Sequence, residues 1–179
     1  TVSVGTQTIT ADALIEATNA YGTTPARFAP LNFFQMATDP LPEDVLRDIM
    51  PGGEGCWDTA LVMSSFRRDA EGRIIVGAIG GMDHALSGLH RHLAKRKLVS
   101  LFPQLKGVEL THGWSGVIAN TSDHIPKIQR LGPRAYTAFG YSGRGIGTGT
   151  LFGRDMAHAA LSGDESGLPV AAIDTYTCP

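Results

Sequence analysis

Residues 140–150 read Gly-Tyr-Ser-Gly-Arg-Gly-Ile-Gly-Thr-Gly-Thr, with glycine at five of the first ten positions. The stretch lies between a predicted strand, Ala135–Phe139, and a predicted helix, Leu151–Leu161. Glycines let the backbone approach a ligand closely, and a helix N-terminus presents free N–H groups and the positive end of a dipole. We therefore expect a site for an anion or a polarised carbonyl. The alternative is a glycine-rich turn that serves packing alone.

The spacing of these glycines excludes two common phosphate-binding motifs. A dinucleotide fingerprint needs glycine at positions i, i+2 and i+5, but Gly143-Arg144-Gly145 is followed by Thr148 and Gly145-Ile146-Gly147 by Thr150. A P-loop would end in Gly-Lys-Ser or Gly-Lys-Thr, and the sequence contains neither tripeptide. The loop would instead suit the end of a flavin ring, where a helix N-terminus stabilises the negative charge of the reduced ring.

Composition narrows the class of protein. The chain has 179 residues, 42% of them hydrophobic and 18% charged, with a net charge of −2. This is typical of a globular domain, and the lack of basic excess argues against nucleic-acid binding. No apolar run approaches the roughly 18 residues that span a bilayer. Cys56 and Cys178 show no metal-ligand spacing, so we expect free thiols in a cytoplasmic protein, with a disulfide as the alternative.

Alternating apolar residues and turn signals predict mostly strands before the glycine stretch. Residues 1–20 predict two strands around a turn at Gly5–Gln7, and residues 11–21 a short apolar strand that runs into small residues. Because the chain opens within this hairpin pattern at Thr1, we expect its natural N-terminus to be missing. Further strands are predicted at 33–38, 61–67, 73–78 and 108–112, with a hairpin loop at 69–72 and one or two helical turns at 43–49.

The clearest amphipathic helix is predicted from Leu86 to Phe102, where Pro103 ends it. Its apolar residues recur at helical spacing, and they include Leu86, Leu89, Leu93, Leu98 and Leu101. The histidines at positions 84, 90 and 92 do not form a ligand set on one helix face, so we interpret them as solvated side chains rather than metal ligands.

Two segments together resemble the C-terminal signature of the D-amino-acid oxidase-like FAD oxidoreductases. They are residues 113–126, GWSGVIANTSDHIP, and residues 140–146, GYSGRGI. Within that superfamily the chain looks most like the bacterial gamma-glutamylputrescine oxidase and glycine/sarcosine oxidase branch. Residues 17–21, 37–42 and 66–77 resemble further family segments in the same order. The family's N-terminal dinucleotide fingerprint is absent, which is expected if the chain begins after it.

The resemblance implies FAD as the cofactor and a set of residues near its ring. In the family, backbone N–H groups of the loop that matches 140–147 reach the pyrimidine oxygen of the flavin. Two roles stay open for Thr148 and Thr150, helix capping or flavin contact, and for Trp114, a core residue or a ring neighbour. Asp123 is expected to be structural. The implied cofactor-binding residues are Gly140, Tyr141, Ser142, Gly143, Arg144, Gly145, Ile146, Gly147, Thr148, Trp114, Gly116, Thr18 and Asn19.

Substrate-binding roles are expected for two residues, Arg67 and Tyr141. A guanidinium suits the carboxylate of an amino acid, although a solvated hairpin arginine is the alternative for Arg67. Arg68 should point to the opposite face of the strand. Tyr141 would either line the substrate side or cap the loop. No catalytic base or metal ligand is predicted.

The resemblance also implies an α/β (α+β) fold. We expect a mixed, largely antiparallel substrate-domain sheet with flanking helices, formed by residues 23–111, and part of a Rossmann-like FAD-binding domain, formed by 1–22 and 112–179. The implied reaction is hydride transfer from a carbon next to nitrogen, in an amine or amino acid, to flavin. The fragment alone is expected to be inactive and to associate with its missing half or with itself. A non-catalytic β-rich module that binds a metabolite or partner is the alternative.

Overall fold

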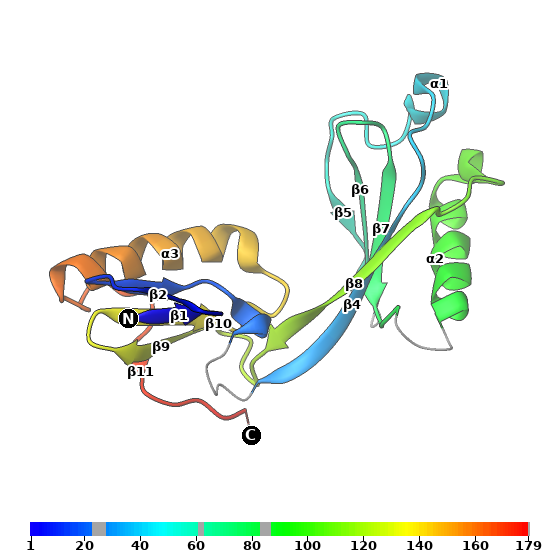
Figure 1. Cartoon of the computed structure of the whole chain (residues 1–179). Coiled ribbons are helices and arrows are strands. Elements are labelled where there is room, and N and C mark those ends of the chain that lie inside the picture. The colour runs from blue at the N-terminus through cyan, green and yellow to red at the C-terminus, as the bar shows by residue number, and fades with distance from the viewer. Residues whose placement is uncertain (23–27, 61–62, 83–86, 179) are drawn as a thin grey trace. The chain divides into compact units, whose positions relative to one another are not determined.

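The computed structural model describes residues 1–22, 28–60, 63–82 and 87–178 (Figure 1). The chain forms two compact units, which are described separately below. The first unit comprises Thr1–Pro30 and Val117–Pro179, and the second comprises Leu31–Gly116.

The first unit is built on a four-stranded sheet with the strand order β11-β9-β10-β3. Its strand β10 (Ala135–Phe139) runs antiparallel to β9 (Lys127–Gly132) and parallel to β3 (Leu14–Glu16). The fourth strand, β11 (Ala172–Ile173), pairs in parallel with β9. The predicted strand at 135–139 and the expected mixed α/β fold are confirmed, whereas β9 and β11 had no counterpart in the sequence analysis.

Helix α3 (Gly145–Ser162) packs on this sheet through residues at helical spacing. Its buried side chains Phe152, Met156, Ala159 and Ala160 form one hydrophobic cluster with Ile128, Tyr136 and Ala138 of the strands. The helix ends at Gly163, which has a φ of 79° and donates its N–H to the Ala159 carbonyl at 2.8 Å.

The start of α3 differs from the sequence prediction, because the helix begins at Gly145 and not at Leu151. Glycine costs a helix about 1 kcal/mol per residue relative to alanine, so Gly145, Gly147 and Gly149 appeared to belong to a loop. Tertiary packing compensates. The Tyr141 side chain lies 3.5 Å from the position that a Cβ would take at Gly145 and 3.9 Å from that at Gly149. Because glycine has no side chain, Tyr141 can pack directly on this side of the helix.

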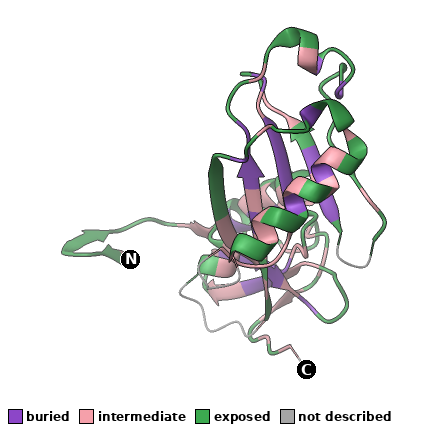
Figure 2. Ribbon diagram, turned by 90° about the vertical axis from the view of Figure 1, so that its right-hand side faces the viewer, coloured by how far each residue is buried: buried purple, intermediate pink, exposed green. Residues whose placement is uncertain are grey.

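The first unit also contains a hairpin of β1 (Val2–Val4) and β2 (Gln7–Ile9), which confirms the prediction of two strands around a turn. Its apolar side chains Val4 and Ile9 are exposed, as the green hairpin next to the N-terminus shows in Figure 2. The 3₁₀ helix η1 (Asn19–Tyr21) follows β3.

The second unit is a five-stranded sheet with the order β5-β6-β7-β4-β8. The strands β5 (Cys56–Trp57), β6 (Ser64–Arg68), β7 (Ile74–Ile79) and β4 (Ala29–Ala37) form successive antiparallel pairs. This confirms the predicted strands over their described residues and the hairpin loop between β6 and β7. The edge strand β8 (His112–Asn120) begins where the sequence prediction of a strand at 108–112 ended, so that prediction was wrong for 108–111.

One face of this sheet is covered by helix α2 (Ser87–Leu101) and by the short segments α1 (Glu43–Leu46) and η2 (Pro103–Leu105). Figure 2 shows the buried strand residues behind this helix. The hydrophobic cluster contains Phe34, Met36, Leu46, Ile49, Met50, Phe66, Ile74, Val76, Ala94, Leu98, Leu105 and Leu110. Periodicity predicted α2 correctly, but it did not identify the buried side, because Ala94 and Leu98 are buried while Leu89, Leu93 and Leu101 are exposed.

Candidate functional site

The glycine-rich loop of the first unit is held in place by hydrogen bonds from its backbone N–H groups to η1 and β8. The Gly140 N–H donates to Asn19 Oδ1 at 3.2 Å, and the Ser142 N–H donates to the Ala119 carbonyl at 3.2 Å. Gly140 has a φ of 78°, and a Cβ there would lie 2.4 Å from Cγ2 of the buried Thr121. Only glycine fits this close approach, so packing accounts for Gly140.

The backbone N–H groups at the start of α3 are not bound by a capping side chain. The Arg144 N–H donates to the Tyr141 carbonyl at 2.8 Å, and α3 begins at the next residue. The first N–H groups of a helix have no carbonyl partners within it, and no side chain caps this helix. A Cβ at Gly147 would meet open space, and Ile146 is 95% exposed. The helix start therefore offers free N–H donors and the positive end of a dipole beside an uncovered apolar side chain.

The hydroxyls of Thr148 and Thr150 do not cap α3. The first donates to the Arg144 carbonyl, and the second donates to the Ile146 carbonyl at 3.1 Å. Both are bonds to a carbonyl four residues earlier within the helix, a pattern that β-hydroxyl side chains adopt in helix interiors. Of the two roles left open for these threonines, helix capping is therefore wrong, since the residue at the cap position is Arg144, and flavin contact stays a prediction.

Tyr141 packs inward in the first unit. Its ring meets that of Phe152 edge-on at a centroid distance of 5.9 Å, and it covers the glycine side of α3 described above. Burial raises the pKa of the Tyr141 hydroxyl, so the group stays protonated at neutral pH. This packing supports the loop, while its predicted contact with substrate stays a prediction.

The second unit has one sheet face that its own helices do not cover. In antiparallel pairs, directly opposed residues share a face, which gives the rows Trp57–Ser65–Gly77–Gln35 and Arg67–Ile75–Ala37. The α2 side of the sheet carries Phe66, Val76 and Met36 instead. A Cβ at Gly77 would lie less than 3 Å from the side chains of Phe33, Ser65 and Gln35, so these three groups converge above that glycine. We call this surface the helix-free face.

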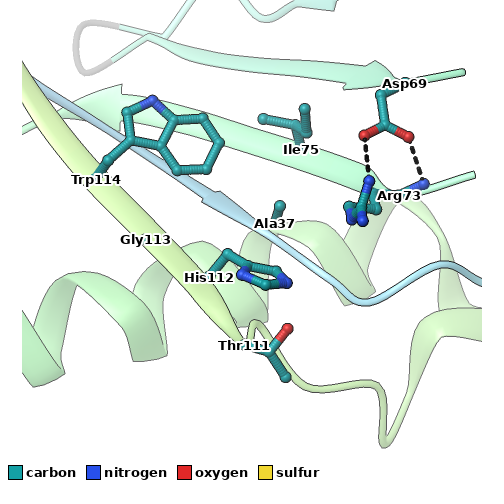
Figure 3. Close-up of a pocket in the computed structure, with 8 residues that line it drawn as sticks. All are labelled: Ala37, Asp69, Arg73, Ile75, Thr111, His112, Gly113 and Trp114. Atoms are coloured by element: carbon teal, nitrogen blue, oxygen red, sulfur yellow. Dashed lines mark hydrogen bonds and ion pairs between the residues drawn. The ribbon is translucent and has the colours of Figure 1, made fainter. Parts of the chain in front are cut away.

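A pocket of about 630 Å³ lies on the helix-free face (Figure 3). Ala37 and Ile75 form its apolar floor, and the side chains of His112 and Trp114 extend over it from β8. Asp69 and Arg73 close the other end, and Thr111 and Gly113 complete the lining. Trp114 is 44% exposed, so it is a wall of this pocket rather than a core residue.

The arginines near this pocket differ in their partners. Arg73 forms ion pairs with Asp69 at 3.3 Å and Glu71 at 2.5 Å, and Arg68 pairs with Glu43 at 2.6 Å. Burial acts to raise the pKa of Asp69, but hydrogen bonds from the backbone and guanidinium of Arg73 lower it overall. Arg67 is exposed, opposes the pocket floor residue Ile75, and has no carboxylate partner in the part of the chain that the structure describes.

The structure groups only some of the residues predicted for the site. It brings Asn19 to Gly140 in the first unit, while the Thr18 hydroxyl donates to Glu16 at 2.8 Å. Trp114 and Gly116 belong to the second unit, and residues 140–148 belong to the first. Whether these residues contact a flavin stays a prediction for all of them.

Sequence reasoning missed three polar residues of the helix-free face, Gln35, Ser65 and His112. A period of two along 33–37 and 112–116 would have indicated a shared face for each set, but cross-strand register is not visible in one sequence. His90 was expected to be solvated, yet its ring is partly buried against Phe34 at 5.3 Å. His84, Leu86 and residues 61–62 lie outside the described residues.

Comparison with known proteins establishes the family. The family described as "FAD dependent oxidoreductase" (DAO) matches residues 1–159, and the chain belongs to it. The chain is 31% identical over 139 residues to the "Probable oxidoreductase OrdL" of Haemophilus influenzae, with 78% of this chain and 31% of that protein covered. It is 31% identical over 140 residues to the "Gamma-glutamylputrescine oxidoreductase" of Escherichia coli, with 77% and 32% covered.

Solved structures agree at the level of the fold. The chain is similar to iminodiacetate oxidase from Chelativorans sp. BNC1, with a TM-score of 0.63, 16% sequence identity, and 90% of this chain and 45% of that chain covered. The chain spans about a third of the length of the curated relatives it matches. The predicted family is thus confirmed, and FAD is the cofactor of that family.

The residues present fit part of a flavin site. The uncapped start of α3, with open space at Gly147 and an uncovered Ile146, suits a flat ring that carries a polar edge. Within the described residues, no cluster of three or more histidines, cysteines or acids is arranged to hold a metal. Cys56 and Cys178 are free thiols. None of the helices described could cross a membrane.

Proposed function

We propose that this chain is part of an FAD-dependent enzyme that oxidises the C–N bond of an amine or amino acid. The observation that carries the proposal is the uncapped, glycine-lined start of α3 in a chain that belongs to the FAD-dependent oxidoreductases. When bound, FAD supplies the oxidising chemistry by accepting a hydride from the carbon next to the substrate nitrogen.

The chain's own residues supply binding and orientation. We assign the N–H groups of Gly145, Ile146 and Gly147 to the polar edge of the flavin, where the helix dipole favours negative charge. The first unit would then belong to the FAD-binding domain and the second to the substrate-binding domain. The gamma-glutamylputrescine oxidoreductase of E. coli, named for an amine, supports this substrate class. The free thiols support a cytoplasmic location.

Arg67 is assigned to a carboxylate on the substrate. It is exposed on the helix-free face, and its charge is not neutralised by a described carboxylate, in contrast to Arg68 and Arg73. A guanidinium binds a carboxylate through two parallel N–H donors, which fixes orientation as well as charge. The apolar floor of Ala37 and Ile75 would lie against the carbon chain of the substrate.

The test is the visible absorbance spectrum of the complete protein, before and after anaerobic addition of amines and amino acids. We expect a flavin spectrum that bleaches with a subset of these compounds, which identifies the substrate class. A complete protein that contains no flavin would contradict the proposal and favour a binding module without catalysis. A flavin that no amine reduces would contradict C–N oxidation and leave the cofactor assignment intact.

A further inference from the structure

His112 and Asp39 form a pair at the edge of the pocket on the helix-free face. His112 begins β8, and Asp39 lies two residues beyond the end of β4. His112 Nε2 lies 3.3 Å from Asp39 Oδ1, and the Thr111 hydroxyl donates to the same oxygen at 3.0 Å. Two neighbouring residues of one segment therefore engage one carboxylate.

Asp39 is held in position by its neighbours. The preceding Thr38 is fully buried, and its backbone N–H donates to the Ile74 carbonyl at 3.1 Å. The Thr38 hydroxyl oxygen accepts from the Ile74 N–H at 3.1 Å, and the Leu41 N–H donates to the Gly72 carbonyl at 3.1 Å. The backbone that carries Asp39 is thus attached to β7 at Thr38 and to the turn before β7 at Leu41, which holds this residue beside His112, and both side chains of the pair are exposed.

This arrangement sets the roles of the two imidazole nitrogens. Nε2 is the imidazole nitrogen that lies beside Asp39, and a hydrogen bond to this carboxylate would place the proton of a neutral His112 on Nε2 and leave Nδ1 as an acceptor. In the part of the chain that the structure describes, Nδ1 has no hydrogen-bond partner. The ring itself lines the pocket beside Trp114 (Figure 3). A carboxylate beside one nitrogen of a histidine that lines a ligand pocket is an arrangement typical of a general base.

We propose that His112, oriented by Asp39, removes the proton from the ammonium group of the substrate before oxidation. The inference rests on the proposed function, since an amine is mostly protonated near neutral pH and gives up a hydride only when its nitrogen carries a free electron pair. The proton passes from the substrate nitrogen to Nδ1 of His112 and then to solvent. The Asp39 carboxylate stabilises the imidazolium that forms between these steps.

The other charged groups around the pocket are less suited to this task. Arg67 and Arg73 stay protonated and cannot accept. Asp69 is occupied by Arg73, whose hydrogen bonds lower the pKa of that carboxyl, and Glu71 pairs with the same arginine. On the segment before β8, Glu109 is bound to Lys95 of α2. Histidine is the side chain that exchanges a proton most readily near neutral pH.

The experiment compares the full-length protein with its His112→Gln variant, using the amine that reduces the flavin. We expect kcat/KM at neutral pH to fall roughly 10²- to 10⁴-fold in the variant. The difference should shrink as pH rises toward about 10, where the free amine forms in solution. Added imidazole should partly restore the activity of a His112→Ala variant. His92→Gln, a change of an exposed histidine on α2, is the matched control and should leave the profile unchanged.

A second readout does not depend on turnover. The ¹⁵N chemical shifts of the His112 ring should move when an amine analogue that cannot be oxidised is added, and those of His92 should not. If the wild-type flavin is reduced by an amine but His112→Gln keeps the wild-type pH profile, the base assignment is overturned while the proposed function stands. If Asp39→Asn abolishes activity that His112→Gln preserves, Asp39 and not His112 is the base. If no amine reduces the wild-type flavin, the proposed function itself fails.

Discussion

Arg67 is the residue that we propose to bind a carboxylate on the substrate. It lies on the helix-free face, whereas its neighbour Arg68 is paired with Glu43. Alternation along β6 places these adjacent arginines on opposite faces, as the sequence predicted for a regular strand. Of these two adjacent arginines, Arg67 is therefore the one placed to bind a ligand on the helix-free face.

We predict that Arg67→Met raises KM for a substrate that carries a carboxylate by about tenfold to a hundredfold. This corresponds to a charge-assisted hydrogen bond of about 1.5–3 kcal/mol. Steady-state kinetics with a carboxylate-bearing amine and with its decarboxylated analogue make the measurement, and only the first should be affected. Arg68→Met is the control. An equal loss for both substrates would contradict a carboxylate-binding role.

The Asp123 carboxyl is expected to make the stability of the fold depend on pH. A hydrogen bond from Lys127, at 2.6 Å, and one from the Ile125 N–H lower the pKa of this carboxyl from 3.8 to about 2. A carboxyl whose pKa is lower in the folded than in the unfolded protein stabilises the fold at pH values above its unfolded-state pKa. This stabilisation is lost as pH falls from about 4 through about 2. Asp123→Asn keeps an oxygen for the Ile125 N–H and removes the charge.

The free energy of unfolding should therefore be lower in Asp123→Asn than in the wild type at pH 6, and the difference should shrink as pH falls and vanish below pH 2. Urea unfolding at several pH values measures it. A difference that is independent of pH would show that the Lys127 pair does not stabilise the fold. This outcome would not affect the cofactor assignment, because Asp123 was expected to be structural.

At the scale of the element, two glycines of helix α3 allow its stability and its proposed flavin contact to be tested separately. Gly147 and Gly153 both lie in this helix, and a Cβ at either position meets open space. Alanine at either position should stabilise the helix by about 0.5–1 kcal/mol, because glycine loses more backbone entropy on folding. Only Gly147 lies in the first turn, where the flavin is proposed to bind.

We predict that Gly147→Ala weakens FAD binding while Gly153→Ala does not, although both stabilise the apoprotein. Fluorescence titration with FAD and urea unfolding of the apoprotein measure the two effects. Unchanged affinity in Gly147→Ala would contradict the proposed contact. Gly140→Ala should instead destabilise the protein by about 1–3 kcal/mol, because its φ of 78° is strained for alanine and its Cβ would clash with Thr121.

At the scale of the whole molecule, each of the two units contains its own hydrophobic cluster. Ile74 is fully buried in the cluster of the second unit, and Ile128 is fully buried in that of the first. Truncating a buried isoleucine to alanine removes apolar contacts and leaves a cavity, at a cost of about 2–5 kcal/mol. The two residues therefore report separately on the units.

We predict that Ile74→Ala lowers amide-exchange protection mainly in residues 31–116 and that Ile128→Ala lowers it mainly in 1–30 and 117–178. Hydrogen exchange read by mass spectrometry makes the comparison in the complete protein. Equal loss of protection in both units from either change would indicate one cooperative structure instead of two.

Much of this protein is determined by patterns that are local in sequence. The short apolar run at 73–78, the turn at Gly72 and the helical spacing of apolar residues in α2 each depend on residues a few positions apart, and all were predicted. The segments 113–126 and 140–146 also sufficed to predict the family. Such patterns can be recognised in a single sequence because each helix or strand must bury its own apolar side.

Only the tertiary structure decided which residues share a surface. The register between β4, β6 and β7 places Arg67, Ile75 and Ala37 in one row across the sheet, and the same fold brings Asp39 to His112 across 73 positions of the chain. The start of α3 was also decided by packing, since Tyr141 covers glycines whose local preference is a loop. A one-residue shift in register would reverse every face, and no local pattern records that choice.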